Sequence, residues 1–326
     1  MATPIGNNVV TSISRRHIRP DLVDNVYKSN VVTFRLFSAN KKIVRGGYQI
    51  EQPLMYGRFT SGGFFHGAEV LDITPADTIL NAAFDWKQAY VPVVVDGRTL
   101  IKVDQPEAIA DFIRTYFAQA EMEMAEILAT GVWSDGSNPK AIDGIEMAVD
   151  DGSIANVYGG LDRSTYGWWK SQVDAATTAL SLGALNSLFN KCSEGGRHPT
   201  LIVSRTDQYE RYWSLNIDRQ QQDIGPAGGD SQLAAAGFRN MLFNGVPWVV
   251  DSHVPDGQST NSKIYMLNED YMELVVSPRA DMEIEDFQTG IYQNAMVSKI
   301  YWAGNLLFSN CARQGVMTSV TTVATS

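Results

Sequence analysis

The chain has 326 residues, of which 44% are hydrophobic and 19% are charged. This is ordinary globular composition, so wholesale disorder is excluded, and at roughly 100–200 residues per domain about two domains are expected. The formal net charge of −10 excludes a broad basic face for nucleic acid, because that affinity depends on neutralising phosphates.

Targeting and cysteine signals point to an intracellular protein. No apolar run approaches the ~20 residues that cross a bilayer, so no membrane partner is expected. The polar N-terminus, Met1 to Asn8, lacks the pattern of a secretory signal. The two cysteines, Cys192 and Cys311, have no metal-binding spacing. Free thiols are expected, with neither a disulfide framework nor a zinc site.

Residues 1–45 do not resemble the start of a compact domain. No segment keeps a period of 3.6, and polar or basic stretches separate short β-prone runs such as Asn30 to Phe37. We expect an extended N-terminal arm.

Residues 46–103 predict a long two-stranded excursion. Gly47 to Thr60 reads as a strand broken at Pro53, and Ile79 to Val95 as its partner, with the Gly-rich, apolar segment Ser61 to Gly67 at the tip. An isolated two-stranded ribbon is only marginally stable in water, so this ribbon is expected to lie on another surface.

A second hairpin is predicted at Asp96-Gly97, the strongest short hairpin signal in the chain. Its arms would be Val93 to Val95 and Thr99 to Val103.

The clearest element is a long helix. Asp104 can cap it, Pro106 suits its first turn, Glu107 completes a capping-box-like pair with Asp104, and Gly131 ends it. About 26 residues at 1.5 Å each give a length on the order of 39 Å. One apolar stripe follows a spacing of three and four: Ile109, Ile113, Tyr116, Phe117, Ala120, Met124, Ile127 and Leu128.

After a loop-rich stretch up to Arg163, helices and strands alternate. Helices are expected at Ser164 to Leu180, Gly183 to Cys192 and Thr206 to Leu215, and a polar loop at Arg219 to Gly229. Strands are expected at Thr200 to Val203, Met241 to Phe243, Val246 to Asp251, Ile264 to Leu267, Tyr271 to Val276, Met296 to Trp302, Leu306 to Asn310 and Val316 to Val320.

This order of parts resembles the major capsid proteins of tailed bacteriophages, of the type known from phage HK97. Two local patterns add to it. Phe243 to Asp251, followed by Ile264 to Tyr271, is similar to the strands late in the family's axial domain, and Lys299 to Gly304, within Gln293 to Val320, is similar to its closing strands. The resemblance covers essentially the whole chain.

The resemblance implies an α+β fold with five parts. These are an N-terminal arm (1–45), an extended loop hairpin with peripheral strands (46–103), a spine helix with peripheral domain (104–145), a mixed axial domain (146–280) and a return to the peripheral domain (281–326). It also implies pentamers and hexamers in an icosahedral shell that encloses phage DNA without reading its sequence, with portal and decoration proteins as further partners. The shell would form in the host bacterial cytoplasm and become the virion capsid.

Two departures from the family matter. Lys299 stands where the closing strand usually has arginine, and the chain lacks a long, charged, helical N-terminal segment. The second departure implies a separate scaffolding protein or a sequence in its processed form, and the presence of Met1 favours the former.

No catalytic or cofactor chemistry is predicted. The chain has no nucleophile elbow, phosphate loop or dinucleotide fingerprint, so no enzyme and no cofactor are expected. The acidic run from Asp281 to Asp286 would place Asp281, Glu283 and Glu285 on one side of a strand. It is interpreted as a solvated strand face in preference to a divalent-cation site, because nothing fixes a ligand geometry. Four histidines are interpreted as ordinary surface or loop side chains: His17, His66, His198 and His253.

Subunit contacts are the predicted functional sites. Phe64 and Phe65 at the loop tip would be costly to leave in water, so we expect them to dock on a neighbouring subunit rather than on their own domain. We assign further interface roles to His66, Trp86, Ile113 and Phe117.

Two rival classes remain, and one family property is not expected. An encapsulin shell would share the fold, and a hydrolase or sugar-binding protein with carboxylates on loops would leave the ribbon unexplained. Some relatives cross-link a lysine to an asparagine of another subunit. Lys87 is the candidate in the loop, but no motif marks a partner, and no cross-link is expected.

Overall fold

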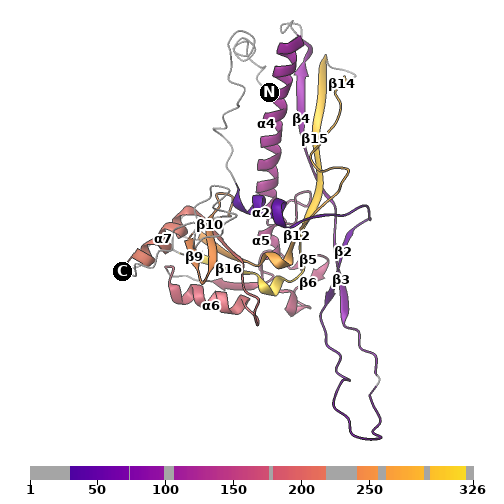
Figure 1. Ribbon diagram of the computed structural model, residues 1–326, viewed down its shortest axis with the longest axis vertical. Helices are drawn as coiled ribbons and strands as arrows, with labels where there is room; N and C mark the ends of the chain where they lie inside the picture. Colours follow the sequence, from indigo (N-terminus) through magenta and orange to yellow (C-terminus); the bar gives the residue numbers. More distant parts are fainter. Residues whose placement is uncertain are drawn as a thin grey trace.

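The computed structural model describes residues 30–72, 74–98, 106–175, 179–217, 241–255, 262–289 and 294–320. The α+β fold has an elongated shape, with the long helix α4 at one end and the β2–β3 ribbon projecting from the other (Figure 1). Most of the predicted arm, the Asp104 cap, the arm Thr99 to Val103 and the loop at 219–229 lie outside the described residues.

The end of the predicted arm is a helix, not an extended run. Helix α2 (Val31–Ala39) begins at Asn30, whose side chain accepts a hydrogen bond from the backbone N–H of Thr33 at 2.9 Å. Val31, Val32 and Leu36 are buried, and α2 packs on α4 and β12. Burial of this face outweighs the preference of β-branched residues for strands.

The predicted ribbon is present. Strand β2 (Ile50–Met55) pairs antiparallel with β3 (Ile79–Phe84), and Pro53 sits within β2 opposite Asn81. Proline is tolerated in such an edge position because its missing N–H can face away from the partner strand.

The first arm of the hairpin predicted at Asp96-Gly97 is part of a longer strand, and its second arm lies outside the described residues. Strand β4 (Lys87–Asp96) pairs along its whole length with β15 (Ala295–Phe308), and the backbone N–H of Gly97 donates to the carbonyl of Asn294 at 2.9 Å. The first arm is therefore held by a strand about two hundred residues away in the sequence.

The long helix is confirmed as α4 (Pro106–Val132). It runs beside the β4–β15 ladder (Figure 1), and Phe112, Met124 and Leu128 are buried along its inner side. The sheet beside it has the order β1-β12-β15-β13, with β4 and β14 also paired to β15. Its further strands are β1 (Lys41–Ile43), β12 (Met272–Val276), β13 (Glu283–Ile284) and β14 (Gln288–Thr289).

A second sheet has the order β7-β16-β11-β8-β10-β9. Leu201 and Val203 of β8 face the main hydrophobic core, while Ile202 faces a second cluster, so this predicted strand is buried on both sides. Helices α6 (Leu182–Cys192) and α7 (Thr206–Ile217), both predicted, pack on this sheet. The strands are β7 (Gln172–Ala175), β8 (Leu201–Ser204), β9 (Met241–Phe243), β10 (Val246–Val250), β11 (Ser262–Leu267) and β16 (Gly315–Val320).

One helix expectation was wrong. Ser164 to Leu180 is not a helix: a short 3-10 turn (Gly167–Trp169) leads into β7, which adds in parallel to β16. Strand β16 in turn joins the second sheet, whereas β12 joins the sheet of β15. Each sheet therefore contains strands from both sides of residue 280.

Candidate assembly surfaces

The base of the ribbon is fixed to the body by aromatic contacts. The ring of Phe84 meets Tyr158 edge-on at 5.2 Å between centroids, and Tyr56 stacks on Trp168 at 6.1 Å. The backbone N–H of Ala83 donates to the carbonyl of Gly159 at 3.0 Å. Gly159 has a φ of +57°, and a Cβ there would collide with the Phe84 ring. Glycine therefore lets the ribbon approach this closely.

A buried arginine packs against Tyr158 at the base of the ribbon. Arg163 is fully buried, lies over the Tyr158 ring at 5.5 Å and is 3.6 Å from the carboxylate of Asp150. Burial alone would raise the pKa of Asp150, but bonds from the Ser153 hydroxyl and three backbone N–H groups hold its pKa below the ordinary value. The guanidinium also donates to four carbonyl oxygens, those of Met147, Ala148, Ala155 and Trp169.

Beyond its base, the loop leaves the body (Figure 1). Phe64 is fully exposed and Phe65 is 64% exposed, and neither belongs to the hydrophobic clusters of the described residues. This loop does not fold back on its own domain. More large apolar side chains are exposed along it: Met55, Phe59, Val70, Leu71 and Ile79.

The other predicted interface residues lie in three places. His66 is exposed beside Phe65 at the tip, and its backbone N–H donates to Glu69 at 3.3 Å. Trp86 is half-buried at the ribbon base and donates to the carbonyl of Gly47. Ile113 and Phe117 lie one turn apart on α4, and Phe117 meets Phe287 of its own chain edge-on at 5.7 Å. Trp86 and Phe117 thus have partners within the chain.

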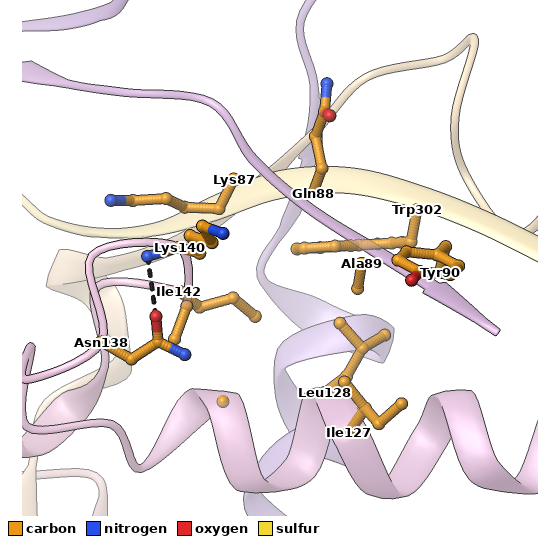
Figure 2. Close-up of a pocket in the computed structure, with 12 residues that line it drawn as sticks. Lys87, Gln88, Ala89, Tyr90, Ile127, Leu128, Asn138, Lys140, Ile142 and Trp302 are labelled. Atoms are coloured by element: carbon orange, nitrogen blue, oxygen red, sulfur yellow. Dashed lines mark hydrogen bonds between the residues drawn. The ribbon is translucent and has the colours of Figure 1, made fainter.

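A pocket of about 270 Å³ opens between α4, β4 and the loop at 138–142. Figure 2 shows Ile127 and Leu128 of α4 on one side, Ala89, Tyr90 and Trp302 from the two strands on the other, and Lys87 and Lys140 beside them. We call it the α4–β4 pocket.

Sequence reasoning missed this pocket. Alternate residues of β4 point inward at Val91, Val93 and Val95, and the same period of two places Tyr90 outward. The exposure of Tyr90 could therefore be predicted from the alternation along this strand. The contribution of Trp302 and the loop at 138–142 could not, because it depends on tertiary contacts.

Lys87 is held within its own chain at the edge of this pocket. Its ammonium donates to the carbonyl of Pro139 at 2.8 Å and lies 3.4 Å from the carboxylate of Asp143. The side chain is 14% exposed, which disfavours a reaction with another subunit.

The histidines are not all surface side chains. His66 and His198 are exposed, and His17 lies outside the described residues. His253, however, is largely buried, and its Nε2 lies 2.7 Å from a Glu126 carboxylate oxygen of α4. The contact ties the chain after β10 to the long helix. His253 lies in a turn, as expected, but the sequence did not predict this contact because the partner is 127 residues away.

The acidic run from Asp281 to Asp286 forms no single strand face. Met282 takes a left-handed φ of +57°, so β13 begins only at Glu283. Asp281 pairs with Lys41 at 2.6 Å, and Glu285 with Lys299 at 3.2 Å. Within the described ranges no group of three His, Cys, Asp or Glu side chains is placed to hold a metal ion, and no helix there is long and apolar enough to cross a membrane.

Comparison with known proteins gives matches to solved structures. No family model matches the sequence, and no curated protein does. The capsid chain of cyanophage A-1(L) superposes with a TM-score of 0.68 at 14% identity, covering 95% of this chain and 98% of that one. The chain has the HK97-like capsid fold. The β2–β3 ribbon is its extended loop and α4 its spine helix.

Other HK97-like structures agree over the full length. The SrpI encapsulin of Synechococcus elongatus has a TM-score of 0.61 at 12% identity and covers 98% of both chains. The capsid of a native GTA particle has a TM-score of 0.59 at 11% identity, covering 94% of this chain and 96% of that chain. These identities are low, so the likeness establishes the fold.

Proposed function

We propose that this chain is the major capsid protein of a tailed bacteriophage, which assembles into an icosahedral shell around double-stranded DNA. The observation that carries the proposal is the projecting loop. Its exposed side chains, including Phe64 and Phe65, have no partner surface among the described residues of their own chain, and an exposed apolar surface of this kind is typical of a protein interaction site. The HK97-like fold supports a partner that is another copy.

The charge of the chain is consistent with this role. With a net charge of −10, the inner wall would enclose DNA without binding it tightly, because tight binding depends on lysine and arginine neutralising phosphates. A separate scaffolding protein would guide assembly, and portal and decoration proteins would complete the virion. Assembly would take place in the bacterial cytoplasm.

Sedimentation and negative-stain microscopy test the proposal. The purified chain, alone and with its candidate scaffolding protein, should form closed shells or rings of five and six. A monomer under all of these conditions would overturn the proposal and return attention to the rival class of hydrolase or sugar-binding protein.

An encapsulin-type compartment is the second candidate, favoured by the likeness to the SrpI encapsulin. Both functions predict shells, so the two are distinguished by what the purified particles contain. Particles purified from the native source should contain double-stranded DNA if the chain is a phage capsid protein. Particles that contain a protein cargo and no DNA would favour the compartment.

A further inference from the structure

The side chain of His253 lies where three parts of the fold meet. It sits in the turn after β10 and is only 10% exposed. On one side its Nε2 is 2.7 Å from a carboxylate oxygen of Glu126 on α4. On the other side its Nδ1 is 3.4 Å from the side-chain nitrogen of Asn30, the residue that caps α2. Helix α2 itself lies beside the C-terminal end of α4 (Figure 1). The imidazole therefore joins the chain after β10 to both helices.

The N-cap of α2 fixes which protons the imidazole carries. The side-chain oxygen of Asn30 accepts the backbone N–H of Thr33 at 2.9 Å, so the NH2 group of the same amide faces His253. An NH2 group only donates, and Nδ1 of the ring must then be the acceptor. The proton of the neutral ring is left on Nε2, where it donates to Glu126. In this form Asn30, His253 and Glu126 make a continuous chain of hydrogen bonds.

A second proton, on Nδ1, reverses the contact with Asn30. The protonated ring has two donors and no acceptor, so its Nδ1–H meets the NH2 group of Asn30 donor to donor. The amide can present its oxygen only by giving up the bond to Thr33 that caps α2. The carboxylate of Asp251 is the alternative acceptor, because its Oδ1 lies 3.4 Å from Nδ1. This carboxylate already accepts the backbone N–H of His253 at 2.9 Å.

The surroundings of the ring suit a positive charge. Asp251 is fully buried, and burial raises the pKa of its carboxyl above the ordinary value. A charged imidazole beside it offsets the cost of burying the carboxylate. Further charged side chains line the adjacent cavity or contact the turn: Glu123 of α4, Asp135, Glu146 with its partner Lys263, and Arg205, whose Nε donates to the carbonyl of Val254. Carboxylates outnumber cations in this group.

We infer that His253 is a pH-sensitive tie between α2 and the rest of the fold. The neutral ring holds Asn30 and Glu126 together. As the pH falls from about 8 to about 5, the range in which histidine ordinarily gains its charge, the ring exchanges Asn30 for Asp251 and keeps Glu126. Acid therefore loosens the start of α2, the element that connects residues 1–29 to the fold, and leaves the contact with α4 in place.

Hydrogen–deuterium exchange of the full-length, unassembled chain tests the inference. It is measured at about pH 7.5 and about pH 5.5, with the intrinsic effect of pH on exchange removed. Peptides that cover α2 should lose about fivefold in protection at the lower pH, as expected for the loss of one N-cap bond. Peptides that cover α6, which packs on β7 and β16, should not change. Equal protection of α2 at both pH values would overturn the inference.

Two substitutions separate the effect of the proton from the effect of packing. His253→Gln gains no proton, and its amide can still donate to Glu126, so the pH effect on α2 should disappear. Asn30→Asp keeps an acceptor for the backbone N–H of Thr33 and offers a second oxygen to the protonated ring. The pH effect should then change sign, with α2 better protected at the lower pH. A purely structural role of His253 would not change that sign.

The variants also give the contrary outcomes. A wild-type pH effect in His253→Gln would overturn the inference, and so would an unchanged sign in Asn30→Asp. If far-UV circular dichroism shows that His253→Gln does not fold, the wild-type chain and Asn30→Asp still decide. Every contact of this tie lies within one chain, so the test does not depend on whether the chain builds a shell.

Discussion

Replacing both tip phenylalanines by serine should block assembly and leave the folded chain intact. Fully burying a phenylalanine side chain contributes ~1.5–3 kcal/mol. Phe64 is fully exposed and Phe65 is 64% exposed before docking, so the double change removes about 2.5–5 kcal/mol per contact. At ~1.4 kcal/mol per factor of ten, each contact weakens about 60- to 4,000-fold. Every contact in a ring is affected equally.

The assay is sedimentation velocity across a series of protein concentrations, with microscopy of the fractions. Phe64→Ser, Phe65→Ser should remain unassembled at concentrations where the wild-type chain forms particles. The thermal unfolding curves of the unassembled wild-type chain and the unassembled serine variant should coincide, because neither phenylalanine belongs to the hydrophobic core. The control Phe64→Leu, Phe65→Leu keeps apolar tips and should assemble. Wild-type assembly by the serine variant would refute the role of the loop.

Three further predictions concern the body of the chain. Arg163→Met should lower the free energy of unfolding by about 3–5 kcal/mol, because it leaves the buried Asp150 unpaired; a loss under about 1 kcal/mol in urea titrations would contradict this. Since the folded-state pKa of Asp150 lies below the ordinary value, the stability it contributes is present above about pH 4 and lost as pH falls through the folded-state pKa; Asp150→Asn should flatten that acid limb. Burial raises the pKa of both Cys192 and Cys311 to about 12, so iodoacetamide at pH 8 should label neither until the chain unfolds, and rapid native labelling would disprove that packing.

Local patterns predict the elements that carry their own signal. The apolar stripe of α4 and the run Leu201 to Val203 each indicate one element type, because periodicity and burial agree there. The ribbon is predicted as well, since strand-forming runs flank the Gly-rich segment Ser61 to Gly67. The exposed tip follows from the same pattern, because apolar residues in a turn-rich segment have no local core to join.

The failures share a physical cause in long-range contacts. Helix α2 depends on burial against α4 and β12, and the pairing of β4 with β15 joins strands about two hundred residues apart. β7, expected as helix, forms because it can add to the edge of β16. The α4–β4 pocket combines residues from four parts of the chain, so no local pattern could define it as a site.

A cryo-electron microscopy reconstruction of the assembled chain tests the central claim most directly. We predict a closed icosahedral particle in which α4 lies in the wall and the Phe64–Phe65 tip of each chain rests on the next. A particle in which the loops point into solvent would contradict the role given to the loop, and a chain that remains monomeric in the presence of its scaffolding protein would contradict the shell function itself.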